Sequence, residues 1–228
     1  MIGKKSAAAA PLVVLLSCAA ALTTVVAATP APPDPINVLK AGLGQAIVLF
    51  NDQRMPLSQR REKLRSMSLQ YFDFESMAKS TLGPHWRNLT AAQRDEFVPV
   101  FTQFIQDAYL SQMEQATVQK IRREVNTANV RFLRQTYFSP DYAEVFSTVA
   151  LPDQKNPLEI DYLMHQHEGR WQVYDVTIDA ISLVSNYRNQ FNRVIDDQGY
   201  AKLIADLQAK REQLQQYMDQ EARNAAAP

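Results

Sequence analysis

Asp175 is the side chain best suited to acid–base chemistry. It lies in the strand-like stretch Trp171–Ile178, with Tyr174 and Asp179 nearby. A carboxylate held in a cavity serves as a general base in some α+β isomerases, so one hypothesis is an envelope enzyme that uses Asp175. The alternative is a structural carboxylate that anchors a turn or pairs with Arg188. We expect the structural role.

Histidine offers little more chemistry. His165 and His167 are two residues apart, a spacing that places both imidazoles on one face of a strand, where they could chelate a metal. His85 is the third and last histidine of the chain, and transition-metal sites generally use three or four ligands. We therefore interpret the pair as exposed polar residues of a strand and expect no metal site.

Other catalytic signatures are missing from the sequence. It contains no Gly-rich phosphate loop, no nucleophile elbow and no Cys/His pair. The sequence consequently predicts that the protein is not an enzyme, that it has no catalytic residue and that it needs no cofactor.

The charge balance argues against nucleic acid as the main partner. Formal net charge is zero, and the first 28 residues hold two lysines and no acidic residue, which leaves 22 basic against 24 acidic residues. Binding phosphate backbones requires concentrated positive charge. Two local clusters, Arg60–Arg65 and Lys120–Arg123, are interpreted as solvated faces.

The N-terminus has the pattern of an export signal. Lys4 and Lys5 precede an apolar run from Ala7 to Ala28, and small residues before Thr29 suit signal peptidase. Two alternatives stay open: lipidation at Cys18 within a lipoprotein-like box, and a retained membrane anchor. Ordinary cleavage is favoured because the apolar run continues well past Cys18.

Export places the mature chain in an oxidising compartment. Cys18 is the only cysteine, so the cleaved chain would have no disulfide and no catalytic thiol. After Ala28 there is no apolar stretch of the ~20 residues that a spanning helix requires.

Helical signals fill the first half of the mature chain. Pro-rich residues 29–35 lead into predicted helices, the last of which opens with Thr90 and Gln93 at capping-box spacing and contains Pro99, expected to bend it. The predicted helices are Ile36–Gln53, Pro56–Gln70, Asp73–Leu82 and a longer one from Thr90.

Alternating patterns then predict strands, and two helices close the chain. Close spacing of the strands leaves no room for crossover helices, so the sheet should be mainly antiparallel and the fold class α+β. The predicted strands are Val118–Glu124, Val130–Phe138, Tyr142–Leu151, Leu158–His167 and Trp171–Ile178, followed by helices Ser182–Asp196 and Tyr200–Met218.

Three separated blocks of the sequence resemble MlaC, the toluene-tolerance family of periplasmic lipid-binding proteins. The first block consists of Trp171, Tyr174, Asp175, Val176, Asp179, Ser182, Leu183, Tyr187, Arg188 and Phe191. The second consists of Phe72-Asp73-Phe74, Ala78, Leu82-Gly83, Trp86 and Thr90–Arg94, and the third is Gly199–Leu207. One departure is Ala180, which stands where the family usually has Gly and should deny the turn a freely positive φ.

The resemblance implies a fold and a function. The fold would be a nuclear-transport-factor-like cone, with a curved sheet and helices enclosing an apolar cavity. The function would be to carry phospholipid through the periplasm between an inner-membrane ABC transporter complex and an outer-membrane lipoprotein–porin complex, and so to maintain lipid asymmetry. A lipid-free envelope adaptor is the remaining alternative.

The domain limits follow from these elements. We expect a signal peptide (1–28), a lead-in (29–35), one lipid-binding domain (36–218) and a tail (219–228). Within the domain, the helical part covers 36–117, the sheet 118–180 and the closing helices 181–218.

The expected lipid-binding residues face one another across a cavity between the Pro99 helix and the concave side of the sheet. On the Tyr142–Leu151 strand, Phe146 competes from the opposite face. The predicted lining consists of Phe97, Phe101, Phe104, Ile105, Val145, Val149, Ile160, Tyr162 and Val173. The sequence does not identify the docking face, and the Arg60–Arg65 and Lys120–Arg123 clusters are candidates for it and for headgroup contact.

Overall fold

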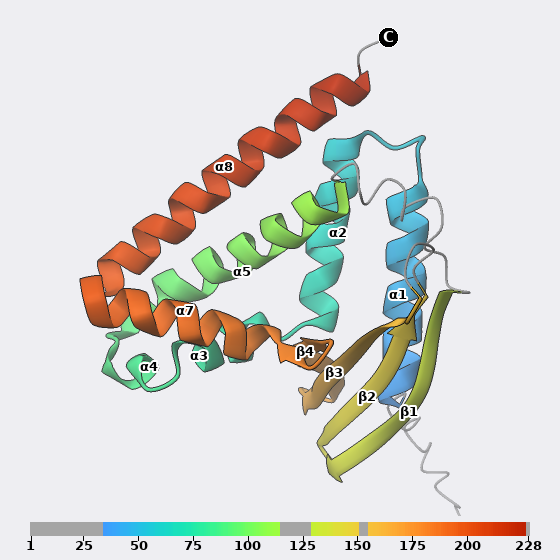
Figure 1. The fold of residues 1–228 in the computed structure, drawn as a ribbon, viewed down its shortest axis with the longest axis horizontal. Helices are drawn as coiled ribbons and strands as arrows, with labels where there is room; N and C mark the ends of the chain where they lie inside the picture. Colours follow the sequence, from blue (N-terminus) through green and yellow to red (C-terminus); the bar gives the residue numbers. More distant parts are fainter. Residues whose placement is uncertain (1–33, 115–128, 151–154, 227–228) are drawn as a thin grey trace, which may run out of the picture. The chain divides into compact units, whose positions relative to one another are not determined.

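A computed structural model describes residues 34–114, 129–150 and 155–226 (Figure 1). The helices of the first half are α1 (Pro35–Asn51), α2 (Leu57–Tyr71), α3 (Phe74–Leu82), α4 (His85–Asn88) and α5 (Ala91–Glu114). The strands are β1 (Val130–Ser139), β2 (Tyr142–Val149), β3 (Leu158–His167), β4 (Arg170–Ile178) and β5 (Ile181–Ser182), and the closing helices are α7 (Leu183–Gln198) and α8 (Tyr200–Ala226).

The fold class is α+β, as the sequence predicts. Within the described residues the strand order is β1-β2-β3-β4-β5, and every pairing between neighbours is antiparallel. The sequence did not predict the two-residue strand β5 or the short helix α4. The predicted strand Val118–Glu124 lies outside the described residues.

Side-chain caps begin several of the helices. The Thr90 N–H donates to Gln93 Oε1 at 2.9 Å, and the Gln93 N–H donates to Thr90 Oγ1 at 3.2 Å, which confirms the predicted capping box. Asp73 caps α3 by accepting the Ser76 N–H at 2.9 Å, and Ser182 caps α7 in the same way from Ser185. Local sequence therefore sets where these helices begin.

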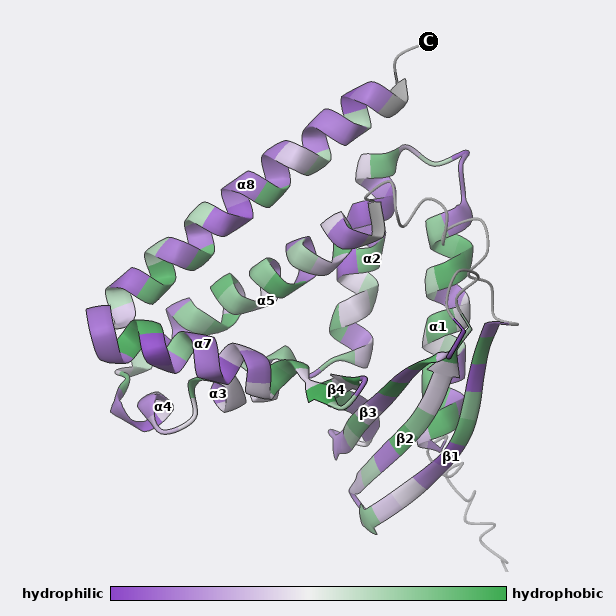
Figure 2. Cartoon of the chain, in the orientation of Figure 1, coloured by the Kyte–Doolittle hydropathy of each residue, from purple (hydrophilic) through white to green (hydrophobic). Residues whose placement is uncertain are grey.

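Buried apolar residues form three clusters in the described part of the chain. The helical cluster joins α3, α5, α7 and α8, and includes Phe97, Phe101, Phe191 and Leu203. The sheet cluster joins the inner face of β2, β3 and β4 to α1 through Leu39. A third, smaller cluster lies where α2, α5 and α8 meet. Figure 2 shows the matching hydrophobic stretches on α1 and α5.

The α2–α3 junction ties the helices to the sheet. Phe72 forms a parallel bridge with Val173 of β4, and the Asp73 N–H donates to the Val173 carbonyl at 2.9 Å. Phe72 also packs against both the helical cluster and the sheet cluster. The two clusters consequently meet at this residue.

The turn between β4 and β5 corrects one expectation. Asp179 and Ala180 both have positive φ, 45° and 65°. The turn thus adopts the left-handed backbone that Ala180 was expected to deny it, because the β4–β5 pairing and the Asp179 contact with Glu159 N–H at 3.1 Å hold it there. An alanine in this region is strained, since its Cβ approaches the following carbonyl.

Candidate functional site

Asp175 anchors the passage from strand to helix. Its Oδ1 accepts the N–H groups of Val176 at 2.8 Å and Val184 at 3.0 Å, and its Oδ2 accepts the Ser182 hydroxyl at 2.6 Å. Both oxygens of this buried carboxylate are therefore engaged. The turn-anchoring role is confirmed, whereas the proposed pair with Arg188 is wrong: Arg188 Nε donates to the Ser80 carbonyl at 2.7 Å.

His165 was predicted to be an exposed strand residue, and this is wrong. Its side chain is largely buried, and its Nε2 lies 2.8 Å from Oδ2 of Asp73, at the α2–α3 junction. The sequence could not reveal this contact because the two residues are 92 positions apart. His85 lies elsewhere, 3.3 Å from Asp196. No group of three or more potential metal ligands occurs among the residues that the structure describes.

Asp73 is held in its ionised form by its neighbours. Burial alone raises its pKa, but hydrogen bonds from the Ser76 N–H and hydroxyl, together with His165, outweigh burial and lower the pKa below its usual value of 3.8. The carboxylate thus caps α3 and binds β3 at once.

The aromatic residues predicted on α5 form the centre of the helical cluster. Phe97 and Phe101 are fully buried and meet Phe191 of α7 edge to face, with ring centroids 6.2 and 6.3 Å apart. Phe104 packs edge to face on Tyr187 at 5.5 Å, and Ile105 is buried in the same cluster. Sequence periodicity found these residues correctly as one apolar face.

The predicted sheet residues lie in a different cluster. Val145 and Val173 are fully buried beside α1, and the half-buried Ile160 and Tyr162 pack against them. Val149, half-buried near the end of β2, belongs to none of the three clusters. The structure therefore divides the predicted lining into a helical group and a sheet group.

Three half-buried aromatic side chains, Phe72, Tyr109 and Tyr187, pack against the helical cluster, and Phe72 also packs against the sheet cluster. None of the three is in the predicted lining. We call the boundary of the two clusters at these residues the seam. Burial, with the nearby Tyr187 and Asp175, raises the pKa of Tyr109 to about 12. Tyr109 follows Ile105 by one helical turn, and this spacing was the available signal.

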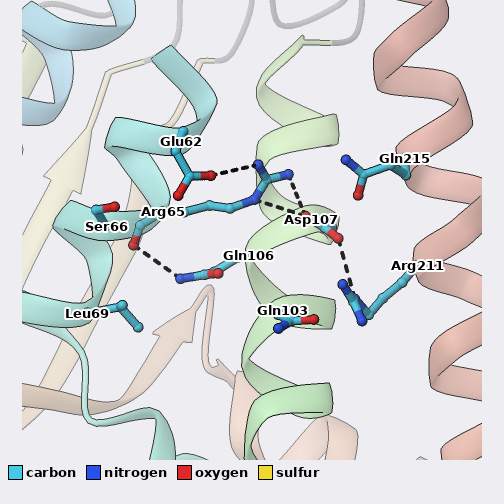
Figure 3. Close-up of a pocket in the computed structure, with 9 residues that line it drawn as sticks. All are labelled: Glu62, Arg65, Ser66, Leu69, Gln103, Gln106, Asp107, Arg211 and Gln215. Atoms are coloured by element: carbon cyan, nitrogen blue, oxygen red, sulfur yellow. Dashed lines mark hydrogen bonds and ion pairs between the residues drawn. The ribbon is translucent and has the colours of Figure 1, made fainter. Parts of the chain in front are cut away.

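A cleft of about 360 Å³ lies between α2, α5 and α8 (Figure 3). The buried Asp107 stands between two arginines: Arg65 Nη2 donates to its Oδ1 at 2.7 Å, and Arg211 Nε lies 3.5 Å from its Oδ2. Gln106 Nε2 donates to the Arg65 carbonyl at 3.2 Å. Polar groups dominate the lining, so this cleft does not offer a surface for acyl chains.

The Arg60–Arg65 cluster is not the solvated face that we expected. Arg60 and Arg61 are buried, and their guanidinium groups donate to the carbonyls of Phe50 at 2.9 Å and Met218 at 2.6 Å. These arginines tie α2 to the end of α1 and to the C-terminal half of α8, while their aliphatic stems pack inside. The second cluster, Lys120–Arg123, lies outside the described residues.

A model of the MlaC family matches residues 44–209, which is most of the chain. The chain belongs to the MlaC family. The MlaC family comprises periplasmic lipid carriers and not enzymes. This membership confirms the resemblance drawn from the three sequence blocks. Across the residues described here, no helix is both long and apolar enough to cross a membrane.

The MlaC fold of the chain also has a solved counterpart. The chain is similar to the phospholipid-binding protein from Ralstonia solanacearum, whose structure is a complex with a phospholipid. The two share 21% sequence identity with a TM-score of 0.64, and the match covers 80% of this chain and 99% of that one. The similarity establishes the α+β arrangement of the MlaC chain.

Proposed function

We propose that the protein is a periplasmic phospholipid carrier whose seam receives the acyl chains. The observation that carries the proposal is the fold, shared over four fifths of the chain with a protein that holds a phospholipid. Membership of the MlaC family points the same way. We therefore assign phospholipid, the ligand of that homologue, as the ligand class of this chain.

The physical requirement for such a carrier is a large apolar surface. Each methylene exposed to water costs about 0.8 kcal/mol, so two ordinary acyl chains cost on the order of 20 kcal/mol. The helical cluster and the sheet cluster adjoin at Phe72, which packs against both. Separation of these clusters would create an apolar space lined from both sides.

The predicted lining residues are consistent with this location. Ile105 and Phe104 contribute from the helical side, and Ile160, Tyr162 and Val173 from the sheet side. Tyr109 and Tyr187 border the seam with phenol groups that can remain near water. Val149 lies outside both clusters. It would contact lipid only if the space between the clusters extended as far as the end of β2.

Two alternative functions are less well supported. A cone-fold enzyme would need Asp175 as its base, but both of its carboxylate oxygens accept hydrogen bonds that hold the β4–α7 junction. A lipid-free adaptor would need no separable apolar seam. The carrier accounts for the half-buried aromatic border of the seam, and the adaptor does not.

Export and delivery complete the proposal. Residues 1–28 would be removed as a signal peptide, with lipidation at Cys18 as the alternative, and residues 36–218 would form the carrier domain. The carrier would exchange lipid with an inner-membrane ABC transporter complex and an outer-membrane lipoprotein–porin complex. Transient docking suits this role, because a tightly held carrier cannot cycle.

Lipid analysis of the purified protein tests the proposal. The protein is isolated from the envelope without detergent, extracted with organic solvent and analysed by mass spectrometry. We expect phospholipid in stoichiometric amount. An extract that contains no lipid, from folded protein, would favour the adaptor.

A further inference from the structure

Three exposed aromatic residues gather at the turn between β1 and β2. Phe138 is 60% exposed, Tyr137 49% and Tyr142 46%, although residues of this size are normally covered. They flank the turn residues Ser139, Pro140 and Asp141. This turn lies at the lower end of the sheet in Figure 1. We call residues 137–142 the aromatic turn.

The aromatic turn is held in place by the sheet beneath it. Tyr137 meets Trp171 of β4 edge to face with centroids 6.0 Å apart, and Tyr142 meets Tyr174 in the same way at 6.0 Å. The Gln166 N–H of β3 donates to the Asp141 carbonyl at 2.9 Å. The exposed rings are therefore presented on a braced hairpin.

Basic residues do not dominate the charges around the aromatic turn. Asp141 is its one charged residue, and Glu144 follows Tyr142 by two positions. In the adjacent turn between β3 and β4, Glu168 lies 3.8 Å from Arg170 and offsets its charge. An anionic partner would call for a basic surround, and a cationic partner for an acidic one. The absence of a basic excess around the turn disfavours an anionic lipid surface and is compatible with a zwitterionic one.

We propose that the aromatic turn contacts the surface of a zwitterionic phospholipid membrane, with Phe138 placed among the upper acyl segments. Tyr137 and Tyr142 flank it with rings whose hydroxyl groups suit the headgroup layer, where amphipathic aromatic residues are favoured. This contact is separate from the acyl-chain seam and does not depend on it.

The area of the aromatic turn favours a lipid surface over a protein partner. Three aromatic side chains that are about half exposed offer roughly 300 Å². A specific protein interface buries roughly 800 Å² on each partner. A lipid surface can accept a small convex group of side chains without a matching shape, and the resulting weak attachment lets a carrier leave again.

Flotation of the full mature protein with phosphatidylcholine vesicles tests this contact. We expect Phe138→Ser to reduce the bound fraction at least about tenfold, because a phenyl ring leaves the apolar layer. Leu133→Ser is the matched control: Leu133 is 58% exposed on the same strand but away from the turn, and its change should leave binding as in the wild type. Circular dichroism verifies that both variants are folded.

A second variant reports the depth of the contact. Phe138→Trp should show fluorescence quenching by phosphatidylcholine brominated in its upper acyl segments, above the background that wild-type Trp86 and Trp171 give. Equal flotation of Phe138→Ser and wild type, an equal loss with Leu133→Ser, or no vesicle binding by the wild type would overturn the proposal. Co-purified lipid is measured in the same samples, so that failure of the membrane contact is distinguished from failure of the carrier function.

Discussion

Ala180 carries backbone strain that a single substitution should relieve. Its φ of 65° is in the left-handed region, where alanine pays about 1–2 kcal/mol that glycine does not. Replacing Ala180 with glycine would remove this cost, but the greater flexibility of glycine in the unfolded chain offsets part of the stability gained. We expect Ala180→Gly to raise the free energy of unfolding by about 0.5–1 kcal/mol, as measured by urea denaturation. A loss of stability would contradict the left-handed conformation.

Asp73 combines a helix cap with a close contact to the His165 ring, and two substitutions separate these roles. Asparagine is an equally good cap but lacks the charge that faces His165. We expect Asp73→Asn to cost about 1–2 kcal/mol at pH 7, and Asp73→Ala about 1 kcal/mol more because the cap is lost as well. Thermal unfolding of both variants against wild type measures the difference.

The contribution of Asp73 to the free energy of unfolding should decrease at low pH. Because the folded-state pKa lies below the usual 3.8, the stabilisation is present above about pH 4 and is lost as the pH falls through the folded-state pKa. The stability gap between wild type and Asp73→Asn should consequently shrink below pH 4. A gap that stays constant from pH 7 to pH 3 would show that the charge is irrelevant.

At the scale of elements, the two glycines of α1 differ in the space around their Cα atoms. A Cβ on Gly42 would meet ring atoms of Tyr71 at 2.7–2.9 Å, whereas a Cβ on Gly44 would meet nothing within 4 Å. Gly42 thus permits the close approach of α2 to α1. Gly44 only weakens the helix, because glycine has a low helix propensity.

Alanine substitution should therefore change the free energy of unfolding in opposite directions at Gly42 and Gly44. Gly44→Ala is expected to stabilise the protein by up to about 1 kcal/mol through helix propensity. Gly42→Ala is expected to destabilise it by about 1–2 kcal/mol, because the Tyr71 ring must move. Parallel denaturation curves check the pair, and equal shifts in the same direction would refute the close α1–α2 contact.

The sequence predicted the elements well where local chemistry determines them. The capping box at Thr90, the alternation of the strands and the short turns between them all act within a few residues. The structure has the corresponding elements wherever it describes the chain, which leaves out the predicted strand Val118–Glu124. Burial of Arg60 and Arg61 was missed because their carbonyl acceptors come from other helices. The partner of His165 was missed for the same reason.

For the molecule as a whole, periodicity identified apolar faces but not which faces meet. The α5 face and the sheet face were each found correctly, yet the structure packs the first against α3, α7 and α8 and the second against α1. Every apolar face can bury itself against several others, so this choice depends on the whole fold. The sequence could therefore not show that the two clusters adjoin at Phe72.

The central claim is that acyl chains lie between the α5 side and the sheet side of the seam. A phospholipid with a photoactivatable group in its acyl chain, loaded onto the protein and illuminated, tests it by peptide mass spectrometry. We predict labels on both sides, at or next to Ile105 and Tyr109 of α5 and Ile160 and Tyr162 of β3. Labelling confined to the polar cleft around Asp107, or to one side of the seam alone, would contradict the account.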